Sequence, residues 1–72
     1  AVAFTSASTV RGFCNVMQNQ SFTHLRAYCI GSQTADEARK FGFVNCIIAK
    51  EATIDSLVQT IVEIETEKKE RN

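Results

Sequence analysis

The feature that most restricts the fold is a pattern that occurs three times, a short apolar run followed by a segment with helical spacing. The runs lie at residues 2–5, 26–30 and 45–49, and a polar turn follows each of them. Strands that alternate with helices form βαβ units, whose strands are parallel and whose crossovers are right-handed. A continuous apolar strand such as 46–49 suits a sheet that is covered on both faces. We therefore predict an α/β fold with a three-layer parallel sheet.

The first helical segment has apolar residues at i, i+3, i+4 and i+7, which is one face of a helix. These residues are Val10, Phe13, Cys14 and Met17. Ser8 or Thr9 is placed to cap the first turn. We expect this helix to fade over residues 18–20.

The second and third helices have clearer limits. Thr34 and Glu37 have the spacing of a capping box, in which each side chain accepts a hydrogen bond from the other residue's backbone N–H. Gly42 then follows as the expected left-handed residue beyond the helix end. Thr53 is expected to cap the third helix, and the charged residues 65–72 predict a solvated end that frays.

Charge and length exclude several classes of protein. Eight basic residues balance eight acidic ones, so the composition predicts no nucleic-acid partner and no anionic membrane partner. The apolar runs are far shorter than the ~20 residues that span a bilayer, and the chain has no signal-peptide pattern. We predict a cytoplasmic protein. Its 72 residues make at most one small domain.

The three cysteines are widely spaced and lie within apolar segments. They are Cys14, Cys29 and Cys46. They form no C-x-x-C pair, so the sequence favours buried free thiols over a zinc site or a redox motif.

The chain begins at Ala1, already within a predicted strand. Because a domain seldom begins inside its own core, we predict that residues 1–72 are part of an α/β domain from a longer protein. A sheet of three parallel strands leaves its edges open. The chain is therefore predicted to pair through an exposed sheet edge, either with another part of its parent protein or with another copy.

The loops that follow the three strands are the best candidate for a binding site. In open α/β sheets, ligands bind beyond the carboxyl ends of the strands. The loops here are residues 5–9, 31–34 and 50–53, and the first two are rich in hydroxyl groups. Each loop precedes a helix N-terminus, which accepts carboxylates or phosphates. The alternative, that Ser8 and Thr34 only cap helices, stays open.

Other candidate residues are weaker. His24 is the only histidine and lies in a polar connection, which favours a surface position. Tyr28 lies in the middle of a strand and is predicted to be in the core. Asp36 and Glu37 are adjacent on a helix and therefore point in different directions, so they make a poor acid–base pair. The sequence also has no glycine-rich nucleotide-binding motif.

Three segments carry a resemblance to a known family. Residues 1–13 have a strand that ends in a turn of the type F-T-S-x-S-x-V, and residues 27–35 contain an I-G-x-x-T-A turn. Residues 53–58 are similar to a closing T-I-x-x-L-V helix. In this order and spacing, the three segments resemble the C-terminal portion of uroporphyrinogen-III synthase.

The resemblance implies a flavodoxin-like domain in a two-domain enzyme with its active site between the domains. The family enzyme is a cyclising hydro-lyase. It closes hydroxymethylbilane, a linear tetrapyrrole with many carboxylates, to uroporphyrinogen III with inversion of the last pyrrole ring, in porphyrin and heme biosynthesis. The resemblance implies no metal and no organic cofactor. With the second wall of the cleft absent, the 72 residues alone are predicted to be inactive.

The resemblance also implies which residues contact the substrate. By position these are Ser6, Ser8, Ser32, Gln33, Thr34 and Ala35. It assigns no catalytic residue within this sequence, because the tyrosine proposed for that role in the family corresponds to a position upstream of Ala1 and not to Tyr28. Many family members carry a different pair at Ser32 and Gln33, so side-chain contacts from Gln33 have the weakest support.

Two other functions remain open from the residues alone. A flavodoxin-like binding or regulatory module would also have a hydroxyl-rich first loop, although a phospho-accepting receiver would need acidic residues that this loop lacks. A small self-associating α/β domain is the other alternative. Bound flavin would favour the former, and a stable dimer that unfolds cooperatively would favour the latter.

Overall fold

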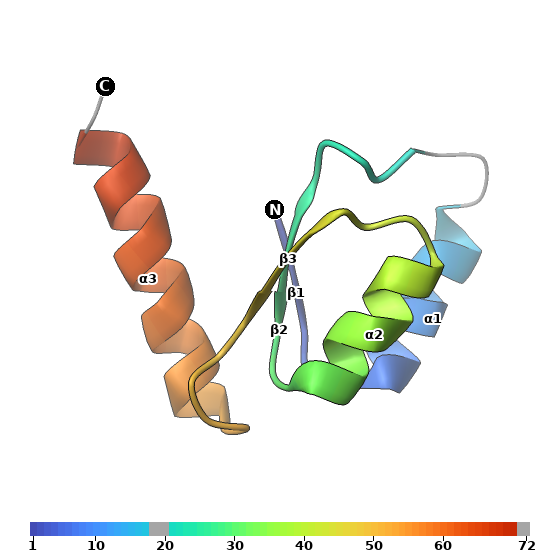
Figure 1. Cartoon of the computed structure of the whole chain (residues 1–72), viewed down its shortest axis with the longest axis horizontal. Coiled ribbons are helices and arrows are strands. Elements are labelled where there is room, and N and C mark those ends of the chain that lie inside the picture. Colours follow the sequence, from blue (N-terminus) through green and yellow to red (C-terminus); the bar gives the residue numbers. More distant parts are fainter. Residues whose placement is uncertain (18–20, 71–72) are drawn as a thin grey trace.

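In the computed structural model, residues 1–17 and 21–70 are described, and they form three strand–helix pairs. The elements are β1 (Val2–Phe4), α1 (Ala7–Val16), β2 (Arg26–Cys29), α2 (Ser32–Lys40), β3 (Asn45–Ile48) and α3 (Ile54–Glu70). The strands form one parallel sheet in the order β1-β2-β3 (Figure 1). The three strand predictions were each one residue too long at the carboxyl end.

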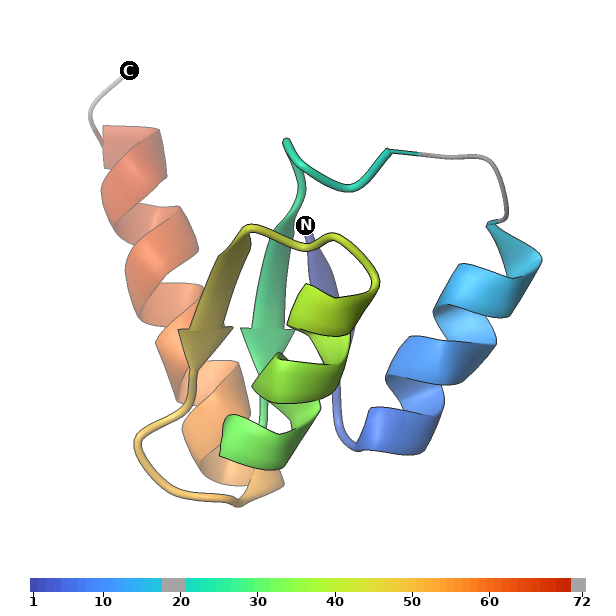
Figure 2. The same ribbon diagram turned by 45° about the vertical axis from the view of Figure 1, so that its right-hand side comes forward.

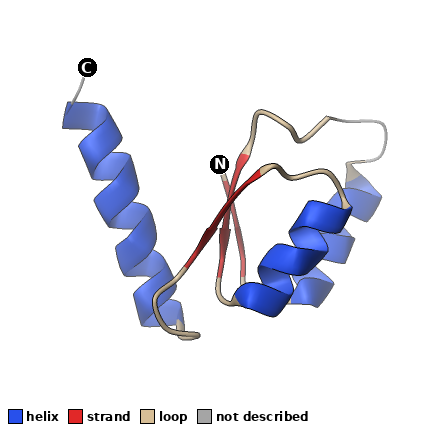
Figure 3. Cartoon of the chain, in the orientation of Figure 1, coloured by secondary structure: helices blue, strands red, loops and turns tan. Residues whose placement is uncertain are grey.

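The helices form a layer on each face of the sheet. α1 and α2 cover one face, and α3 lies alone on the other (Figures 1 and 2). Figure 3 shows the strands enclosed between these two helical layers. The predicted three-layer α/β architecture is confirmed.

The larger part of the core lies between the sheet and the helices α1 and α2. Small residues on β2 and α2 let the helix approach the sheet, and aromatic rings fill the remaining space. The buried residues of this cluster are Phe4, Val10, Cys14, Phe22, Ala27, Cys29, Ala35, Ala38 and Phe43. On the other face a smaller cluster, formed by Tyr28, Ala49 and Leu57, holds α3 against the sheet.

The helix ends differ from the prediction in α1 and α2. Ser6, and not Ser8 or Thr9, is the N-cap of α1. α2 begins at Ser32 with Gly31 as its N-cap, so Thr34 lies inside the first turn and caps nothing. The capping-box spacing misled the prediction because the N-cap lies three residues earlier, at Gly31, which takes the extended conformation without a side-chain cap.

The C-terminal end of α2 and the start of α3 agree with the prediction. Gly42 has φ +104°, and the N–H of Phe43 donates to the carbonyl of Ala38, which is a Schellman-type helix end. Thr53 Oγ1 accepts a hydrogen bond from the N–H of Ser56 at 3.1 Å. The first helix ends at Val16, with Met17 as its C-cap, and the predicted fading over 18–20 falls outside the described residues.

The C-terminal helix is more than a solvated end. Glu65 accepts a hydrogen bond from the hydroxyl of Tyr28 and lies 3.0 Å from Arg26 Nη1. Both partners are on β2, so this contact ties the second half of α3 to the central strand. Tyr28 itself is 1% exposed, which confirms its predicted place in the core. The prediction that residues 65–72 are solvated is therefore wrong at Glu65.

This contact predicts how Tyr28 titrates. Burial raises the pKa of the Tyr28 hydroxyl, and its hydrogen bond to Glu65 raises the pKa further, while Arg26 acts in the opposite direction. A group whose pKa is raised by folding stabilises the folded state below its unfolded pKa, here 10.0, and loses that contribution as the pH rises further. The free energy of unfolding should thus fall less steeply above pH 10 in Tyr28→Phe than in wild type.

The measurement is simple because the chain has one tyrosine and no tryptophan. Tyrosinate absorbance, followed during a pH titration, reports Tyr28 alone. The native chain should titrate at a higher pH than the same chain in concentrated urea. Coincident native and denatured curves would show that Tyr28 is neither buried nor hydrogen-bonded to Glu65.

Candidate functional site

A cleft of about 470 Å³ lies at the carboxyl ends of β1 and β2. It brings together the loop between β1 and α1, the loop between β2 and α2, and one residue of the loop after β3. The lining residues are Thr5, Ser6, Ala7, Ile30, Gly31, Ser32, Gln33, Thr34 and Ala52. The cleft therefore lies at the edge of the sheet where the sequence predicted a site.

At the first helix of the cleft, the hydroxyl groups cap the helix. Ser6 Oγ accepts a hydrogen bond from the N–H of Thr9, and Thr9 Oγ1 accepts one from the N–H of Ser6, both at 3.2 Å. Thr9 Oγ1 also donates to the Ser6 carbonyl oxygen at 2.6 Å. This reciprocal box satisfies part of the α1 N-terminus internally. The alternative that Ser8 caps this helix is wrong, because Ser6 is the N-cap.

At the second helix of the cleft, no side chain caps the N-terminus. Gly31 is extended, with φ −160° and ψ 177°, and has no hydroxyl to offer. Its carbonyl accepts the N–H of Ala35 at 3.1 Å, which begins the helical ladder. The preceding N–H groups, those of residues 32–34, have no helical carbonyl to bond. Together with the helix dipole, they make the α2 N-terminus the more receptive of the two to an anion.

Thr34 strengthens this end of the cleft. The residue is 4% exposed and lines the cleft, yet its hydroxyl makes no hydrogen bond to any group in the described part of the chain. Among the described residues, the only buried side-chain polar atom without a partner is Arg26 Nε, so the Thr34 hydroxyl is open to the cleft, where water or a ligand can bond it.

The predicted site residues separate into two groups. Ser6, Ser32, Gln33 and Thr34 line the cleft. Ser8 is exposed outside it and accepts a hydrogen bond from Arg11 Nη2 at 3.2 Å.

Ala35 is also outside the cleft lining. It is fully buried in the core, and its N–H is already bonded to Gly31. Thr5 and Ala52 line the cleft but were not singled out, although both lie in loops that parallel topology places at this edge.

No ionisable side chain is among the residues that line the cleft. Its positive potential comes from backbone N–H groups, and its side chains can donate or accept hydrogen bonds without transferring charge. This wall can bind and orient a carboxylate, but none of its side chains has the pKa of a general acid or base at neutral pH.

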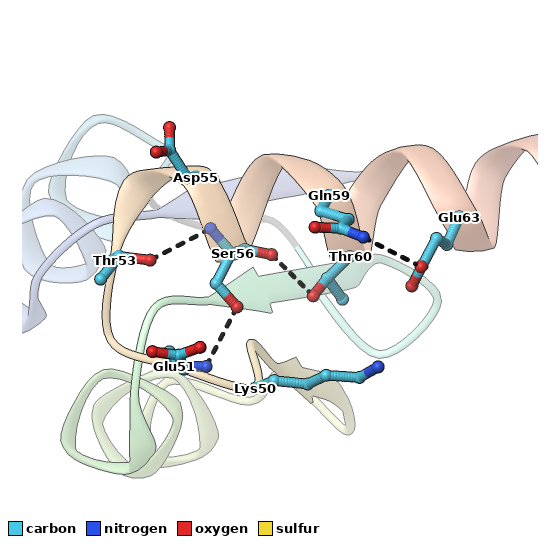
Figure 4. Close-up of a pocket in the computed structure, with 8 residues that line it drawn as sticks. All are labelled: Lys50, Glu51, Thr53, Asp55, Ser56, Gln59, Thr60 and Glu63. Carbon is cyan, nitrogen blue, oxygen red and sulfur yellow. Dashed lines mark hydrogen bonds between the residues drawn. The ribbon is translucent and has the colours of Figure 1, made fainter.

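A second hollow, of about 210 Å³, lies between the β3–α3 loop and the exposed side of α3 (Figure 4). Its hydroxyls bond within the protein, since Ser56 Oγ accepts the N–H of Glu51 at 3.0 Å and Thr60 Oγ1 donates to the Ser56 carbonyl at 2.8 Å. Three carboxylates, those of Glu51, Asp55 and Glu63, outnumber the one lysine, Lys50. This hollow would repel an anionic ligand.

The opposite edge of the sheet carries a third hollow of about 150 Å³. His24, Arg26 and Glu65 are among the residues that line it, and His24 is exposed. His24 is therefore at the amino ends of the strands, and the cleft is at their carboxyl ends. Its predicted surface position is confirmed.

The cysteines have no role in the cleft. All three thiols are free, and burial raises the pKa of Cys29 to about 11, so this thiol stays protonated. Cys29 pairs in register with Ile48, and Cys46 pairs with Ala27. This two-residue offset separates the two cysteine Cα atoms by roughly 8 Å, which is too far for a disulfide without backbone movement.

Neither a metal-binding cluster nor a membrane-spanning helix occurs in the described residues. No group of three or more His, Cys, Asp or Glu residues there could hold a metal ion. No helix in the same part of the chain is long and apolar enough to cross a membrane.

Comparison with known proteins gives two matches. Residues 1–59 match the family model described as uroporphyrinogen-III synthase HemD. The chain is also 41% identical over 63 residues to the porphyrin biosynthesis protein HemD of Ruminiclostridium josui. That alignment covers 88% of this chain and 12% of the relative, which is a much longer protein. No solved structure matches the chain significantly.

Proposed function

The chain belongs to the uroporphyrinogen-III synthase family, a family of porphyrin-biosynthesis enzymes, and from this premise we propose that it forms one wall of a substrate cleft in a longer enzyme. The reaction is the cyclisation of hydroxymethylbilane to uroporphyrinogen III. The cleft at the carboxyl ends of β1 and β2 holds one carboxylate of this substrate. Residues 1–72 are the C-terminal part of that enzyme.

The observation that carries the proposal is the uncapped N-terminus of α2. Residues 32–34 line the cleft, their helix has no side-chain cap, and none of the lining residues contributes a negative charge. A carboxylate bound there replaces the water that otherwise solvates these donors. Hydrogen bonds to a charged group are worth about 1.5–3 kcal/mol each, more than those between neutral groups.

The proposed role of this wall is to hold and orient the substrate. Ring closure needs loss of the terminal hydroxyl group and approach of the two ends of a flexible chain, and fixed carboxylates restrict that chain to folded conformations. Because this wall has no ionisable side chain, any group that transfers a proton to the departing hydroxyl comes from another part of the enzyme. The 72 residues alone should therefore bind tetrapyrrole carboxylates without closing the ring.

Thr34→Val tests the assignment. The substitution keeps the branched shape and removes the hydroxyl, so we expect folding to be retained and the affinity for uroporphyrinogen III to fall about tenfold, which equals 1.4 kcal/mol. Affinity is measured by titrating the product into the labelled chain and following the backbone N–H resonances of residues 32–34. In the longer enzyme the same substitution should lower kcat/KM for hydroxymethylbilane.

Ser8→Ala is the matched control, because Ser8 is a hydroxyl residue in the first turn of the neighbouring helix α1 and lies outside the cleft lining. It should leave binding and turnover unchanged. Equal affinities for wild type, Thr34→Val and Ser8→Ala would contradict the proposal. Perturbation by inorganic phosphate or flavin mononucleotide with no response to the tetrapyrrole would favour the flavodoxin-like alternative.

A further inference from the structure

The outer edge of β3 is open to a further strand. In the described part of the chain, β2 is the one strand beside it. The N–H of Ala49 donates to the carbonyl of Cys29 on β2 at 2.9 Å. Because successive residues of a strand direct their backbone groups to alternate sides, those of Cys46 and Ile48 face away from β2. β3 contains neither proline nor lysine, two residues that commonly block an edge.

Apolar side chains accompany these open backbone groups. Ile48 is in register with Cys29, which is fully buried in the core beside α2, yet Ile48 is 40% exposed. Cys46 lies two residues earlier, on the same face of the sheet, and is partly buried. A strand paired with this edge would therefore remove apolar surface of Ile48 from water as well as bond its backbone.

The helices leave room for a second copy at this edge, and α2 comes close enough to contact it. α2 packs equally against β2 and β3, so its axis lies above the space between the two strands. Two copies paired through β3 about a two-fold axis would place their α2 helices two strand spacings apart, about 9–10 Å, which is the distance at which helices pack. α3 contacts the central strand instead, so the two α3 helices would lie about 14 Å apart and would not collide.

The flank of α2 that faces this edge carries one charge of each sign. Glu37 faces α1, since its Oε2 lies 3.3 Å from Arg11 Nη1. With about 100° between successive residues, Arg39 lies on the opposite flank, toward the β3 edge. Asp36 Oδ1 lies 3.2 Å from Arg39 Nη1, and more than half of each of these two side chains is exposed. Such a flank is complementary in charge to an antiparallel copy of itself.

We propose that a second copy of this chain pairs with β3, antiparallel about a two-fold axis near Ile47, so that the two sheets join into one. Cys46 of each copy then lies opposite Ile48 of the other, and the two residues exchange backbone hydrogen bonds. α2 runs antiparallel to the strands, from the carboxyl end of β2 to the amino end of β3, so the axis also passes near its middle. Asp36 of each copy thereby lies opposite Arg39 of the other, as a self-complementary interface requires.

The opposite edge of the sheet does not offer this fit. In Figure 2, α1 lies outermost, beyond β1. Two copies paired through β1 would place both α1 helices above the joined edges in overlapping space, because packed helices lie about 8–10 Å apart whereas neighbouring strands lie about 4.8 Å apart. The carbonyl of Phe4 faces β2, where it accepts the N–H of Ile30 at 3.1 Å, so the N–H of Ala3 faces the open β1 edge. Ala3 is therefore the internal control.

Hydrogen exchange locates the interface in the 72-residue chain. As the protein concentration rises about 100-fold, sedimentation equilibrium should show a monomer that becomes a dimer, and exchange of the Ile48 N–H should slow at least tenfold. Exchange of the Ala3 N–H should stay the same, because the β1 edge remains in water.

Charge reversal tests the contact between the α2 helices. Arg39→Asp replaces attraction by repulsion on both sides of the axis, so the Kd of the dimer should rise at least tenfold. Asp36→Arg combined with Arg39→Asp should restore the Kd to within about threefold of wild type. Lys40→Asp is the matched control, because it makes the same change in net charge at the next residue, whose Nζ lies 3.6 Å from Glu37 Oε1 on the flank toward α1. It should raise the Kd by less than about threefold.

Any one of four results overturns the inference. The chain could stay monomeric over the whole range of concentration. Exchange could slow at Ala3 in place of Ile48, which would assign the interface to β1. Equal effects of Arg39→Asp and Lys40→Asp would trace the loss to net charge, and a charge swap without recovery would show that Asp36 and Arg39 do not meet across the axis. None of these measurements involves a tetrapyrrole, so the inference can fail while the proposed function stands.

Discussion

Replacing Phe43 by alanine is expected to leave the chain largely unfolded at 25 °C. Phe43 is 1% exposed and its ring contacts three others: it stacks on Phe22 with centroids 4.7 Å apart, and lies 5.5 Å from Phe4 and 6.1 Å from Phe13. A Phe→Ala change in a core costs about 3–5 kcal/mol. The core of a domain this small supplies little more than about 3–5 kcal/mol of net stability, so the loss is comparable to the whole.

Phe41→Ala is the matched control for this prediction. Phe41 lies two residues earlier, at the C-cap of α2, and is 42% exposed. Its removal should cost only about 1–2 kcal/mol, because 42% of its surface is already in water. Urea unfolding followed by far-ultraviolet circular dichroism compares the three proteins. A Phe43→Ala variant that unfolds cooperatively, with a loss similar to that of Phe41→Ala, would contradict the cluster's role.

The aromatic cluster also illustrates what the sequence could predict about the fold. Strand–helix alternation was sufficient for the parallel sheet, because local periodicity determines which face of each element is apolar. The same periodicity could not reveal that Phe22, in a polar connection, would stack on Phe43. That contact depends on how two connecting segments meet in the folded chain, which the local sequence pattern does not predict.

The sequence predicted the edge of the sheet at which the cleft lies. Topology alone brings the first and second loops together, and Ser32, Gln33 and Thr34 line the cleft, whereas Ser8 and Ala35 lie outside its lining. The positions of Ser8 and Ala35 depend on where each helix begins, and α1 and α2 both begin earlier than their capping patterns predict. The contacts of Glu65 could not be predicted from local pattern, because its partners Arg26 and Tyr28 are distant in sequence.

Ser32→Asp should separate stability from function at the proposed site. Ser32 is the first residue of α2 and lines the cleft. A carboxylate at a helix N-terminus stabilises the helix by about 0.3–1 kcal/mol, so the variant should unfold at a slightly higher urea concentration than wild type. The same carboxylate occupies the donors proposed for the substrate and repels it.

The expected loss of binding is large. Two like charges about 4 Å apart repel by about 4 kcal/mol at the effective dielectric constant of a protein surface, and solvent and salt reduce this. We expect uroporphyrinogen III to bind the Ser32→Asp chain about 10²-fold more weakly, and kcat/KM in the longer enzyme to fall by at least the same factor. A packing defect would lower both stability and binding. A small gain in stability together with a loss of binding therefore distinguishes a blocked anion site from damage to the fold.

Ser8→Asp supplies the control with the same chemistry at the neighbouring helix. Ser8 lies in the first turn of α1, beside Arg11 and outside the cleft, so an aspartate there should also stabilise its helix. Ser8 is exposed and outside the cleft lining, so water and salt weaken the effect of its charge, and tetrapyrrole affinity should fall much less than in Ser32→Asp. If Ser8→Asp weakened binding as much as Ser32→Asp, the effect would come from net charge. If neither did, the uncapped N-terminus of α2 would not be where the substrate carboxylate binds.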